Sequence, residues 1–514
     1  MTTSIRGGEH ANAAGSRVAC SMVSAAVASL ALAVPACGEV KLPAIFGHNM
    51  VLQQNRDVPV WGWAAPGEKI TVSFAGRQAA ATADGQGRWK TRLAVPPADG
   101  KPGDLVVEGN SRVIFTNVVA GEVWLCSGQS NMKFEVSGTV HAQEAIASAN
   151  YPLIRLFVAR MWAAPEPQPD LKGAWTVCSP ATVGGVSAVG YFFGRDLHLA
   201  LKVPVGIIDS TSGGTAAEAW ISQPTLEADP VLKPLVHPDP EFFKTVDQYD
   251  RDWTEYQKAQ AEKRNPMPPY PKPPFRGWGY PVSSFYNAMI APLVPFAIQG
   301  AAWYQGEART GRFTQYGHEL SALIKDWRAA WGQGDFPFLV VQLPAISPVW
   351  NWALTREQQA NVARTVPRTG LVVTLDVGDP NDLHPRNKEP VGQRLALVAE
   401  AMAYGKDVVA AGPTYEAMKV EGDKIRLTFQ HTDGGLVAKD GDLKGFVVAG
   451  TNRQFAAATA RIDGATVLVS GAGIAGPAAV RYAFEDNPAC NLFNGAGLPA
   501  APFRTDDWPV PLAK

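Results

Sequence analysis

Hydrophobic and polar residues alternate along the first part of the chain, from residue 39 to about residue 120. The segment DVPVWGWAAPGEKITVSFAGRQAAATADGQGRWKTRLAVPP shows this alternation between Gly, Pro and Asp-Gly turns. Side chains of a β-strand point alternately to the two faces of a sheet, so a period of two is typical of half-buried strands. The pattern predicts a small β-sandwich over residues 38–120.

From residue 121 the apolar segments become continuous and alternate with helical patterns. Strand-like segments are VPVGIIDS, FAIQGAAWY, FPFLVVQLP and LVVTLDVG. The segment HELSALIKDWRAAWGQ places its large apolar residues on one face of a helix. Continuous apolar strands are expected where helices cover both faces of a parallel sheet. The sequence therefore predicts an α/β domain over residues 121–407, with VGQRLALVAEAMAYG as its closing helix.

A surface insertion is expected within this domain, over residues 224–280. A charged, helix-prone stretch is followed by the Pro-rich segment NPMPPYPKPP, which can continue neither a helix nor a central strand. The end of the insertion carries Trp278 and Tyr280, which are candidates for lining a substrate pocket. Segments such as KIRLTFQ and AAVRYAF then restore the alternation, so residues 408–514 are predicted to form a second β-sandwich.

The N-terminal residues 1–37 have the pattern of an export signal. Two arginines precede a continuous apolar run from Val18 to Val34, which has about the length of a signal h-region. Val34 and Ala36 fit the −3 and −1 positions of a signal-peptidase site. The sequence VPAC also resembles a lipoprotein box with Cys37 as the lipidated residue, so soluble export and lipid anchoring both stay open. Because of this signal, we expect a periplasmic or extracellular protein. No second apolar run is long enough to span a membrane.

Composition and charge exclude several classes of function. Of the 514 residues, 46% are hydrophobic and 18% charged, which is the balance of a globular protein. The formal net charge is −1 and no long basic run is present, so we expect no nucleic-acid partner. The five cysteines and eight histidines are scattered, so neither a metal nor another cofactor is expected.

Four loops of unusual composition follow predicted strands of the α/β domain. In an open parallel sheet, ligands bind outside the carboxyl ends of the strands. The loops are Gly128–Met132, Ser212–Thr215, Gln305–Glu307 and Asp379–His384. Each loop taken singly is also typical of an ordinary turn or helix cap. Together they supply the groups that a serine hydrolase needs.

The residue types in these loops correspond to separate catalytic tasks. Ser130 can act as a nucleophile, and Asp382 close to His384 can orient and stabilise a general base. The glycines 213–214 allow backbone N–H groups to approach an oxyanion, and Gln305 offers a side-chain donor. No GxSxG motif is present, which argues against an α/β-hydrolase fold.

Several motifs of the chain resemble one known family. GQSNM, SGGTAAEAW, WYQGE and DVGDPNDLHPRNKEPVGQRLA are similar to the characteristic blocks of sialate O-acetylesterases, which belong to the SGNH (GDSL-like) hydrolases. The similarity extends from LPAIFGHNMVLQQ to NPACNLFN, nearly the whole mature chain. It implies a flavodoxin-like three-layer SGNH hydrolase domain with a parallel sheet, extended by β-sandwich regions at both ends. It also implies a serine carboxylic-ester hydrolase.

Carried over by position, the resemblance implies Ser130 as the nucleophile and His384 as the general base. The implied orienting acid is Asp382. Many family members have an aspartate three residues before the histidine, where this chain has Asn381. Asp379 is therefore the alternative acid.

The resemblance also implies three oxyanion donors. They are the backbone N–H groups of Ser130 and Gly214, with Gly213 as the neighbouring candidate, and the side-chain amide of Gln305. Around Gln305, relatives often have the sequence WYQGESNA, whereas this chain has WYQGEART and therefore carries Arg309. Arg309 is expected either to contact a substrate carboxylate or to be a solvated loop residue.

The function implied by the resemblance is hydrolysis of O-acetyl esters on sugars, with sialic acid and acetylated xylan or other hemicellulose as candidate substrates. A different class stays open as the alternative: a non-catalytic carbohydrate-binding protein built on a hydrolase scaffold. The chain has 15 tryptophans, some of which could stack against sugar rings. The complete set of Ser130, Asp382 and His384 favours the enzyme, because a binding protein has no use for it. No peptide-binding motif supports a protease.

Overall fold

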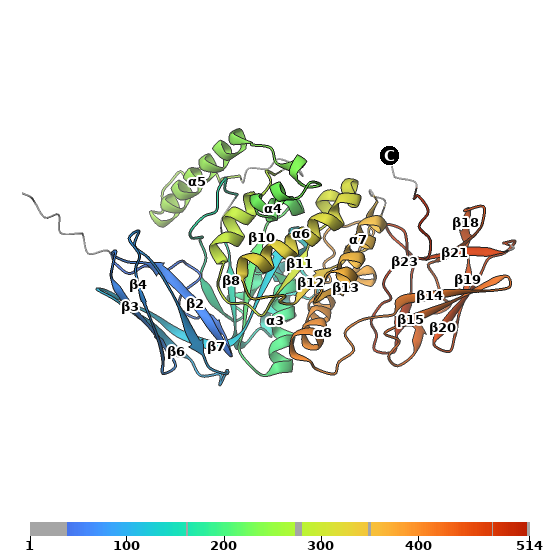
Figure 1. Cartoon of the computed structure of the whole chain (residues 1–514), viewed down its shortest axis with the longest axis horizontal. Coiled ribbons are helices and arrows are strands. Elements are labelled where there is room, and N and C mark those ends of the chain that lie inside the picture. Colours follow the sequence, from blue (N-terminus) through green and yellow to red (C-terminus); the bar gives the residue numbers. More distant parts are fainter. Residues whose placement is uncertain (1–38, 161–162, 273–279, 348–350, 475, 511–514) are drawn as a thin grey trace, which may run out of the picture.

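A computed structural model describes residues 39–510 except 161–162, 273–279, 348–350 and 475 (Figure 1). The expected export signal, with Cys37, lies outside the described residues. None of the helices within the described part is long and apolar enough to cross a membrane.

A central, mostly parallel sheet lies in the middle of the molecule. Its strand order is β13-β12-β11-β7-β10-β8-β9, and every neighbouring pair is parallel except β8 and β9. The predicted mixed α/β fold with a parallel sheet is confirmed. The strands are β7 Arg112–Gly128, β8 Tyr151–Val158, β9 Trp175–Cys178, β10 Val205–Thr211, β11 Gly300–Tyr304, β12 Phe338–Val341 and β13 Thr369–Val372.

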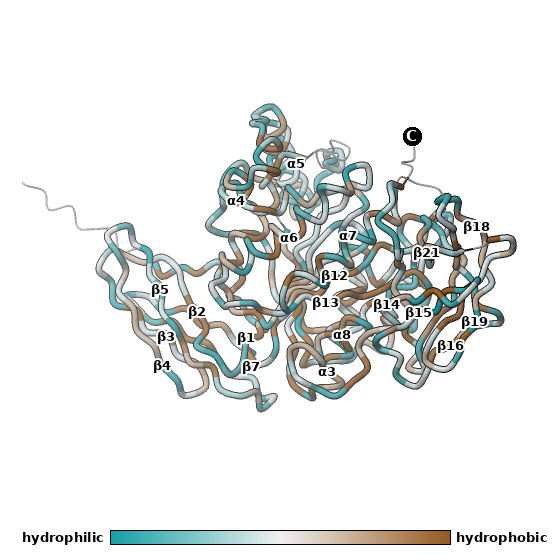
Figure 2. The backbone as a smooth tube through the Cα atoms, turned by 45° about the vertical axis from the view of Figure 1, so that its right-hand side comes forward, coloured by the Kyte–Doolittle hydropathy of each residue, from teal (hydrophilic) through white to brown (hydrophobic). Residues whose placement is uncertain are grey.

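The central strands are buried on both faces, as their continuous apolar sequences predict. Val123 and Leu125 of β7 contribute to the hydrophobic cluster on one face, and Trp124 and Cys126 contribute to the cluster on the other. Figure 2 shows the hydrophobic character of the central strands β12 and β13. Because side chains alternate along a strand, a fully apolar strand needs a cover on each face.

Two pairs of long helices provide these covers (Figure 1). Residues of α3 and α8 complete the cluster around Trp124, whereas residues of α6 and α7 complete the cluster around Val123. The predicted apolar face of α6, which consists of Leu320, Leu323, Ile324, Trp327 and Trp331, is buried. The helices of this region are α1 Ser130–Lys133, α2 Ala142–Ala147, α3 Ala188–Leu201, α6 Phe313–Trp331, α7 Trp352–Thr365 and α8 Glu389–Tyr404.

The N-terminal β region continues directly into the central sheet. Strand β6 pairs antiparallel with the first half of β7, and the second half of β7 pairs with β10 and β11. The boundary expected at residues 120–121 therefore falls inside a single strand of 17 residues. The other strands are β1 Val51–Gln53, β2 Arg56–Trp63, β3 Lys69–Phe74, β4 Arg77–Thr82, β5 Arg88–Val95 and β6 Gly103–Glu108.

The C-terminal β region has sheets of its own and a hydrophobic core to which Ala345, Val373 and Leu375 of the α/β region also belong. Its two four-stranded sheets have the orders β14-β15-β20-β19 and β18-β17-β21-β23, and β16 pairs with β22. Ile425, Leu427, Val448 and Val480 belong to the core between the sheets. The strands are β14 Thr414–Glu421, β15 Lys424–Gln430, β16 Leu436–Ala438, β17 Phe446–Gly450, β18 Phe455–Ala457, β19 Thr459–Asp463, β20 Thr466–Ser470, β21 Pro477–Tyr482, β22 Leu492–Asn494 and β23 Phe503–Arg504.

The described part of the predicted insertion contains the α-helices α4 Gln223–Ala228 and α5 Pro240–Ala261. The charged stretch forms α5, which lies on the outside of the α/β region in Figure 1. Phe242 and Val246 of α5 are buried and join the same hydrophobic cluster as Tyr280. One apolar stripe thus holds an otherwise charged helix on the surface.

Candidate functional site

The strand register brings three loop starts together at one edge of the sheet. Gly128, the last residue of β7, pairs with Thr211 of β10 on one side and with Tyr304 of β11 on the other. The chain leaves β7 toward one side of the sheet and returns later to the opposite side. This is a topological switch point, where open parallel sheets bind their ligands.

The turn after β7 presents Ser130 at this edge. Gly128 has φ +133°, and a Cβ there would collide with the backbone oxygen of Tyr304, so glycine is required. The backbone N–H of Gln129 donates to the same oxygen at 3.0 Å. Helix α1 begins at Ser130. The N–H of a first helical residue has no acceptor within its helix, so it is available to a ligand.

The structure brings His384 into direct contact with Ser130, although the two are 254 positions apart. The distance between His384 Nε2 and Ser130 Oγ is 2.8 Å. Burial and the nearby Lys388 lower the pKa of His384 below its ordinary value, while Asp382 acts in the opposite direction. The neutral imidazole therefore predominates at pH 7 and can accept the proton of the serine hydroxyl.

Of the two candidate acids, Asp382 is the one that acts on the imidazole. Its Oδ1 accepts the backbone N–H of His384 at 2.8 Å, and its charge raises the pKa of His384. Asp379 Oδ1 instead accepts the backbone N–H of Asn381 at 2.8 Å. Asp382 thus fixes the backbone of the histidine loop and supplies a compensating negative charge. Its membership of a catalytic triad stays a prediction.

The glycine loop after β10 lies directly over Ser130. A Cβ on Gly213 would lie 3.7 Å from the Cβ of Ser130, and Gly214 has φ +70°. The start of this loop is fastened by the Ser212 N–H, which donates to the Gly128 oxygen at 3.1 Å. Gly213 therefore lies beside Ser130, and the donor role of both glycines stays a prediction.

Gln305 is fully buried and connects several loops of the site. Its Nε2 lies 3.1 Å from Gln129 Oε1 and 3.1 Å from the Thr215 oxygen. Its backbone oxygen accepts hydrogen bonds from Tyr316 and Gln359. A side-chain amide has two N–H donors, and in this structure both are engaged. Donation to an oxyanion, which stays a prediction, would require one of these bonds to be exchanged.

The expected substrate-binding residues are placed less directly. Tyr280 is 4% exposed, and its ring packs edge-on against Phe242 and Phe285, which are the contacts of a core residue. Trp278 lies outside the described residues, and so does the side chain of Arg309. The proposed binding role of these three residues stays a prediction. Within the described residues, no group of three His, Cys, Asp or Glu side chains could hold a metal ion.

Comparison with known proteins identifies the family. A family model described as "Carbohydrate esterase, sialic acid-specific acetylesterase" matches residues 275–401. The sialate O-acetylesterase of Mus musculus is 30% identical over 415 residues, which are 71% of this chain and 74% of the mouse protein. The human sialate O-acetylesterase is 29% identical and covers 74% of this chain and 75% of its own length. The chain belongs to the sialate O-acetylesterase family.

A solved structure agrees with this assignment. The crystal structure of a carbohydrate acetylesterase from Xanthomonas citri matches with a TM-score of 0.79 and 35% sequence identity, over 91% of this chain and 100% of that one. This chain is therefore an esterase of the carbohydrate esterase class, as predicted. The similarity runs over almost the whole described length and does not favour the alternative of a non-catalytic binding protein.

Three buried polar residues of the site were not selected from the sequence: Asn131, Glu307 and Lys388. Asn131 and Glu307 lie within loops that the sequence singled out, and Lys388 follows the fourth loop by four residues. Their exposed fractions are 0%, 5% and 1%. Charged side chains are mostly exposed in proteins, so the sequence pattern alone assigns such residues to the surface.

Proposed function

We propose that this esterase removes O-acetyl groups from sugars through a serine acyl-enzyme. The observation that carries the proposal is the 2.8 Å contact between Ser130 Oγ and His384 Nε2 at the switch point of the parallel sheet. The names of the relatives add support, since they are sialate O-acetylesterases and a carbohydrate acetylesterase.

In the proposed reaction, Ser130 Oγ attacks the acetyl carbonyl carbon while His384 Nε2 takes the hydroxyl proton. Negative charge develops on the carbonyl oxygen, and the N–H groups of Ser130 and Gly214, with Gly213 as the neighbouring candidate, stabilise it. Gln305 is the third proposed donor. The imidazolium returns its proton to the leaving sugar oxygen as the tetrahedral intermediate collapses.

The second half of the reaction uses the same groups with water in place of the sugar. His384 accepts a proton from water, which attacks the acetyl carbon bound to Ser130. The bond between that carbon and Ser130 Oγ then breaks, the imidazolium returns its proton to Oγ, and acetic acid leaves. Asp382 stabilises the imidazolium in both halves by its negative charge. Ser130 and His384 regain their starting protonation states by the end of the cycle, so the proposed mechanism needs no cofactor.

We assign the catalytic region to the SGNH hydrolases as part of this proposal. Five neighbouring strands lie in the order β10-β7-β11-β12-β13. When only these five are numbered along the chain, the order is 2-1-3-4-5, which is the flavodoxin-like arrangement. Helices on both faces support a three-layer domain over residues 121–407 with an insertion at 224–280. The β regions 38–120 and 408–514 are then additions to it. We also propose that residues 1–37 direct export to the periplasm or beyond, with Cys37 as a candidate lipid anchor.

The decisive experiment is acetate release by the purified protein from two substrates offered in parallel. O-acetylated sialic acid and acetylated xylo-oligosaccharide represent the two candidate classes. We expect release from at least one of them, and Ser130→Ala should lower kcat by about 10⁴-fold or more. Ser137→Ala, in the short turn that follows α1, is the matched control and should keep full activity.

Full activity of the Ser130→Ala variant would overturn the serine mechanism. Absence of release by the wild-type protein, together with tight binding of either sugar, would support the binding-protein alternative. Release from only one substrate would assign the sugar class.

A further inference from the structure

Behind the serine lies a cluster of three buried polar side chains that take no part in the acyl-transfer steps: Asn131, Glu307 and Lys388. Burying a charged group without a partner is strongly unfavourable. We therefore expect these two ionisable groups and the amide to be stabilised by contacts with one another.

Asn131 is the centre of the cluster and connects three separate loops. Its Nδ2 donates to Glu307 Oε1 at 2.6 Å and to the backbone oxygen of Leu383 at 3.0 Å. Its Oδ1 accepts a hydrogen bond from Lys388 Nζ at 2.5 Å. One side chain beside Ser130 thus holds the loop after β11, the loop that carries His384 and the start of α8.

Lys388 completes the cluster as a cation that is almost fully enclosed. Its Nζ lies 5.2 Å from the centre of the Phe134 ring and 5.4 Å from that of the Tyr304 ring, which are favourable distances for a cation over an aromatic face. Burial lowers the pKa of Lys388 to about 7, although the charges of Glu307 and Asp382 act to raise it.

Glu307 is the anionic partner of the cluster. Burial raises the pKa of its carboxyl group, and both the Asn131 hydrogen bond and Lys388 oppose this rise. The three residues are therefore coupled to one another by hydrogen bonds and charge. Loss of any one of them leaves a buried polar group without its partner.

We propose that Asn131, Glu307 and Lys388 form a positioning network that fixes the His384 loop against Ser130 and places the Lys388 cation near the imidazole. The inference rests on the proposed roles of Ser130 and His384. The hydrogen bond to the Leu383 oxygen holds the backbone one residue before the general base. Misplacement of a catalytic group by about 1 Å can lower the rate by about 10²-fold, so this anchor acts on kcat.

The cation has a second effect, whose sign follows from the charges that act on His384. These are Asp382 from its own loop, which raises the pKa of His384, and Lys388 from the start of α8, which lowers it. Glu307 belongs to the β11 loop and acts on Lys388. Below pH 6.5, where an ordinary histidine titrates, Lys388 is mostly protonated because its own pKa is about 7.

Removing the positive charge should therefore raise the pKa of His384. The base must be neutral to accept the serine proton, so the acid limb of kcat/KM should move to higher pH. A charge at close range shifts a pKa by about one unit or more. We expect Lys388→Gln, which keeps an N–H donor but loses the charge, to move the acid limb by about one pH unit.

The test compares pH profiles of kcat/KM, together with kcat and KM at the optimum, for Lys388→Gln, Lys388→Arg and Asn131→Ala. Lys388→Arg keeps the cation and should leave the acid limb near its wild-type position. Asn131→Ala should lower kcat by up to about 10²-fold with KM little changed. Lys406→Met is the matched control, because Lys406 follows the other end of α8 and contacts Ala200 and Glu400.

Titration of His384 by NMR in the Ser130→Ala background gives a readout that turnover cannot supply. The imidazole pKa should rise when Lys388→Gln is added. If a Lys388 variant does not fold, Glu307→Gln serves in its place, since it changes the charge that acts on Lys388 while keeping an acceptor for Asn131.

An unchanged acid limb and an unchanged imidazole pKa in Lys388→Gln would overturn the network, provided that Ser130→Ala is inactive. Retained activity in Ser130→Ala would instead overturn the proposed function itself. The two failures are therefore distinguishable.

Discussion

The two β regions of this chain are attached to the catalytic region in different ways. The N-terminal region shares the strand β7 with the central sheet, so main-chain hydrogen bonds run through the junction. Its apolar residues, such as Val60 and Val72, belong to the same hydrophobic cluster as Val123 and Leu125 of the central sheet. Backbone pairing and a common core therefore hold this junction together.

The C-terminal region is attached by side chains without strand pairing. Among the described residues, none of its strands pairs with a strand of the central sheet, and its core takes in only Ala345, Val373 and Leu375 from the catalytic region. Arg356 of α7 is fully buried and donates to the backbone oxygens of Leu343, Pro344, Glu485 and Asp486 at 2.6–2.8 Å. The Asp486 carboxylate accepts the N–H groups of Trp352 and Ala353 at the start of α7.

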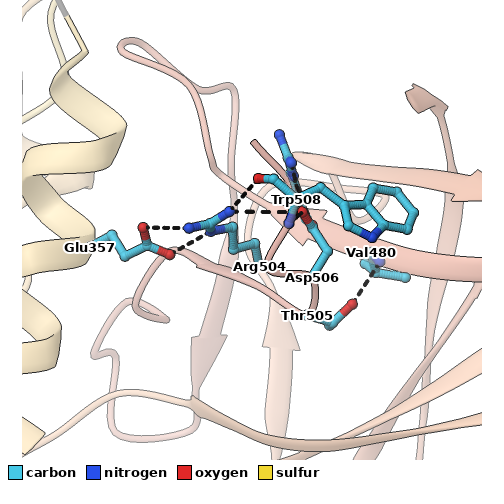
Figure 3. Close-up of polar contacts among 7 residues, drawn as sticks. Glu357, Val480, Arg504, Thr505, Asp506 and Trp508 are labelled. Carbon is cyan, nitrogen blue, oxygen red and sulfur yellow. Dashed lines mark hydrogen bonds and ion pairs between the residues drawn. The ribbon is translucent and has the colours of Figure 1, made fainter. Parts of the chain in front are cut away.

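A partly buried ion pair adds to this junction. Arg504 of β23 lies between Glu357 of α7 and Asp506, and its Nε is 2.6 Å from Glu357 Oε1 (Figure 3). Individual side chains, more than backbone pairing, therefore determine how the C-terminal region sits on α7. Such contacts can be removed one at a time.

The side-chain junction also leads to the histidine loop. The Ser347 N–H donates to the Pro380 oxygen at 3.0 Å, and Asn487 Nδ2 donates to Ser347 Oγ at 2.9 Å. Leu383, next to His384, packs against the small cluster of Leu343, Ile346 and Trp352. Changes in the C-terminal region should therefore reach the active site, whereas surface changes in the N-terminal region should not.

The largest effect is expected from Arg356→Met. It removes the four hydrogen bonds of a fully buried guanidinium, although the oxygens of Pro344 and Asp486 keep a second donor each. Loss of a buried group's hydrogen-bond partner costs about 1–3 kcal/mol. The free energy of unfolding should fall by about 3 kcal/mol or more, measured by urea denaturation.

Arg56→Met at the other junction is the control, because Arg56 reaches its partners Ile298 and Gln299 only at 3.4 Å. It should change the unfolding free energy by less than about 1 kcal/mol. Equal losses in the two variants would contradict the asymmetry between the junctions.

A smaller effect is expected from Asp486→Ala, which removes the cap of α7. Loss of such a cap lowers the free energy of unfolding by about 1 kcal/mol. Because the same segment supports the loop beside His384, kcat should also fall, by up to about 10²-fold.

Asp84→Ala in the N-terminal region removes a comparable carboxylate, which accepts the N–H groups of Gln86 and Arg88. Steady-state kinetics of this variant should match those of the wild-type protein. A drop in kcat as large as that of Asp486→Ala would mean that the two β regions do not differ in their coupling to the site.

The smallest effect is expected from the ion pair of Glu357 and Arg504. Both side chains are 19% exposed, so solvent screens the pair only in part. A double-mutant cycle with Glu357→Ala and Arg504→Ala should give a coupling energy of about 1 kcal/mol, which decreases with added salt. A coupling of zero would leave Arg356 and Asp486 as the contacts that hold the junction.

Much of the fold could be predicted from local sequence pattern. Alternation indicated strands in both β regions, continuous apolar runs indicated β10, β11 and β12, and the apolar stripe of HELSALIKDWRAAWGQ indicated α6. These signals depend on which face of a strand or helix is buried, and that information lies within a few residues of sequence. The motifs also selected the loops that meet at Ser130.

Tertiary structure decided the features that depend on register and topology. Ser130 and His384 meet at 2.8 Å because parallel strands place their carboxyl ends on one edge of the sheet. Only its pairing partners show that β7 belongs both to the N-terminal β region and to the central sheet. Lys388 and Glu307 are charged residues of types that are usually exposed. Their burial beside Asn131 results from the packing of three distant loops. The sequence by itself determined which elements form and which residues have suitable chemistry, whereas packing decided which of them touch, because contacts between distant segments have no local pattern to encode them.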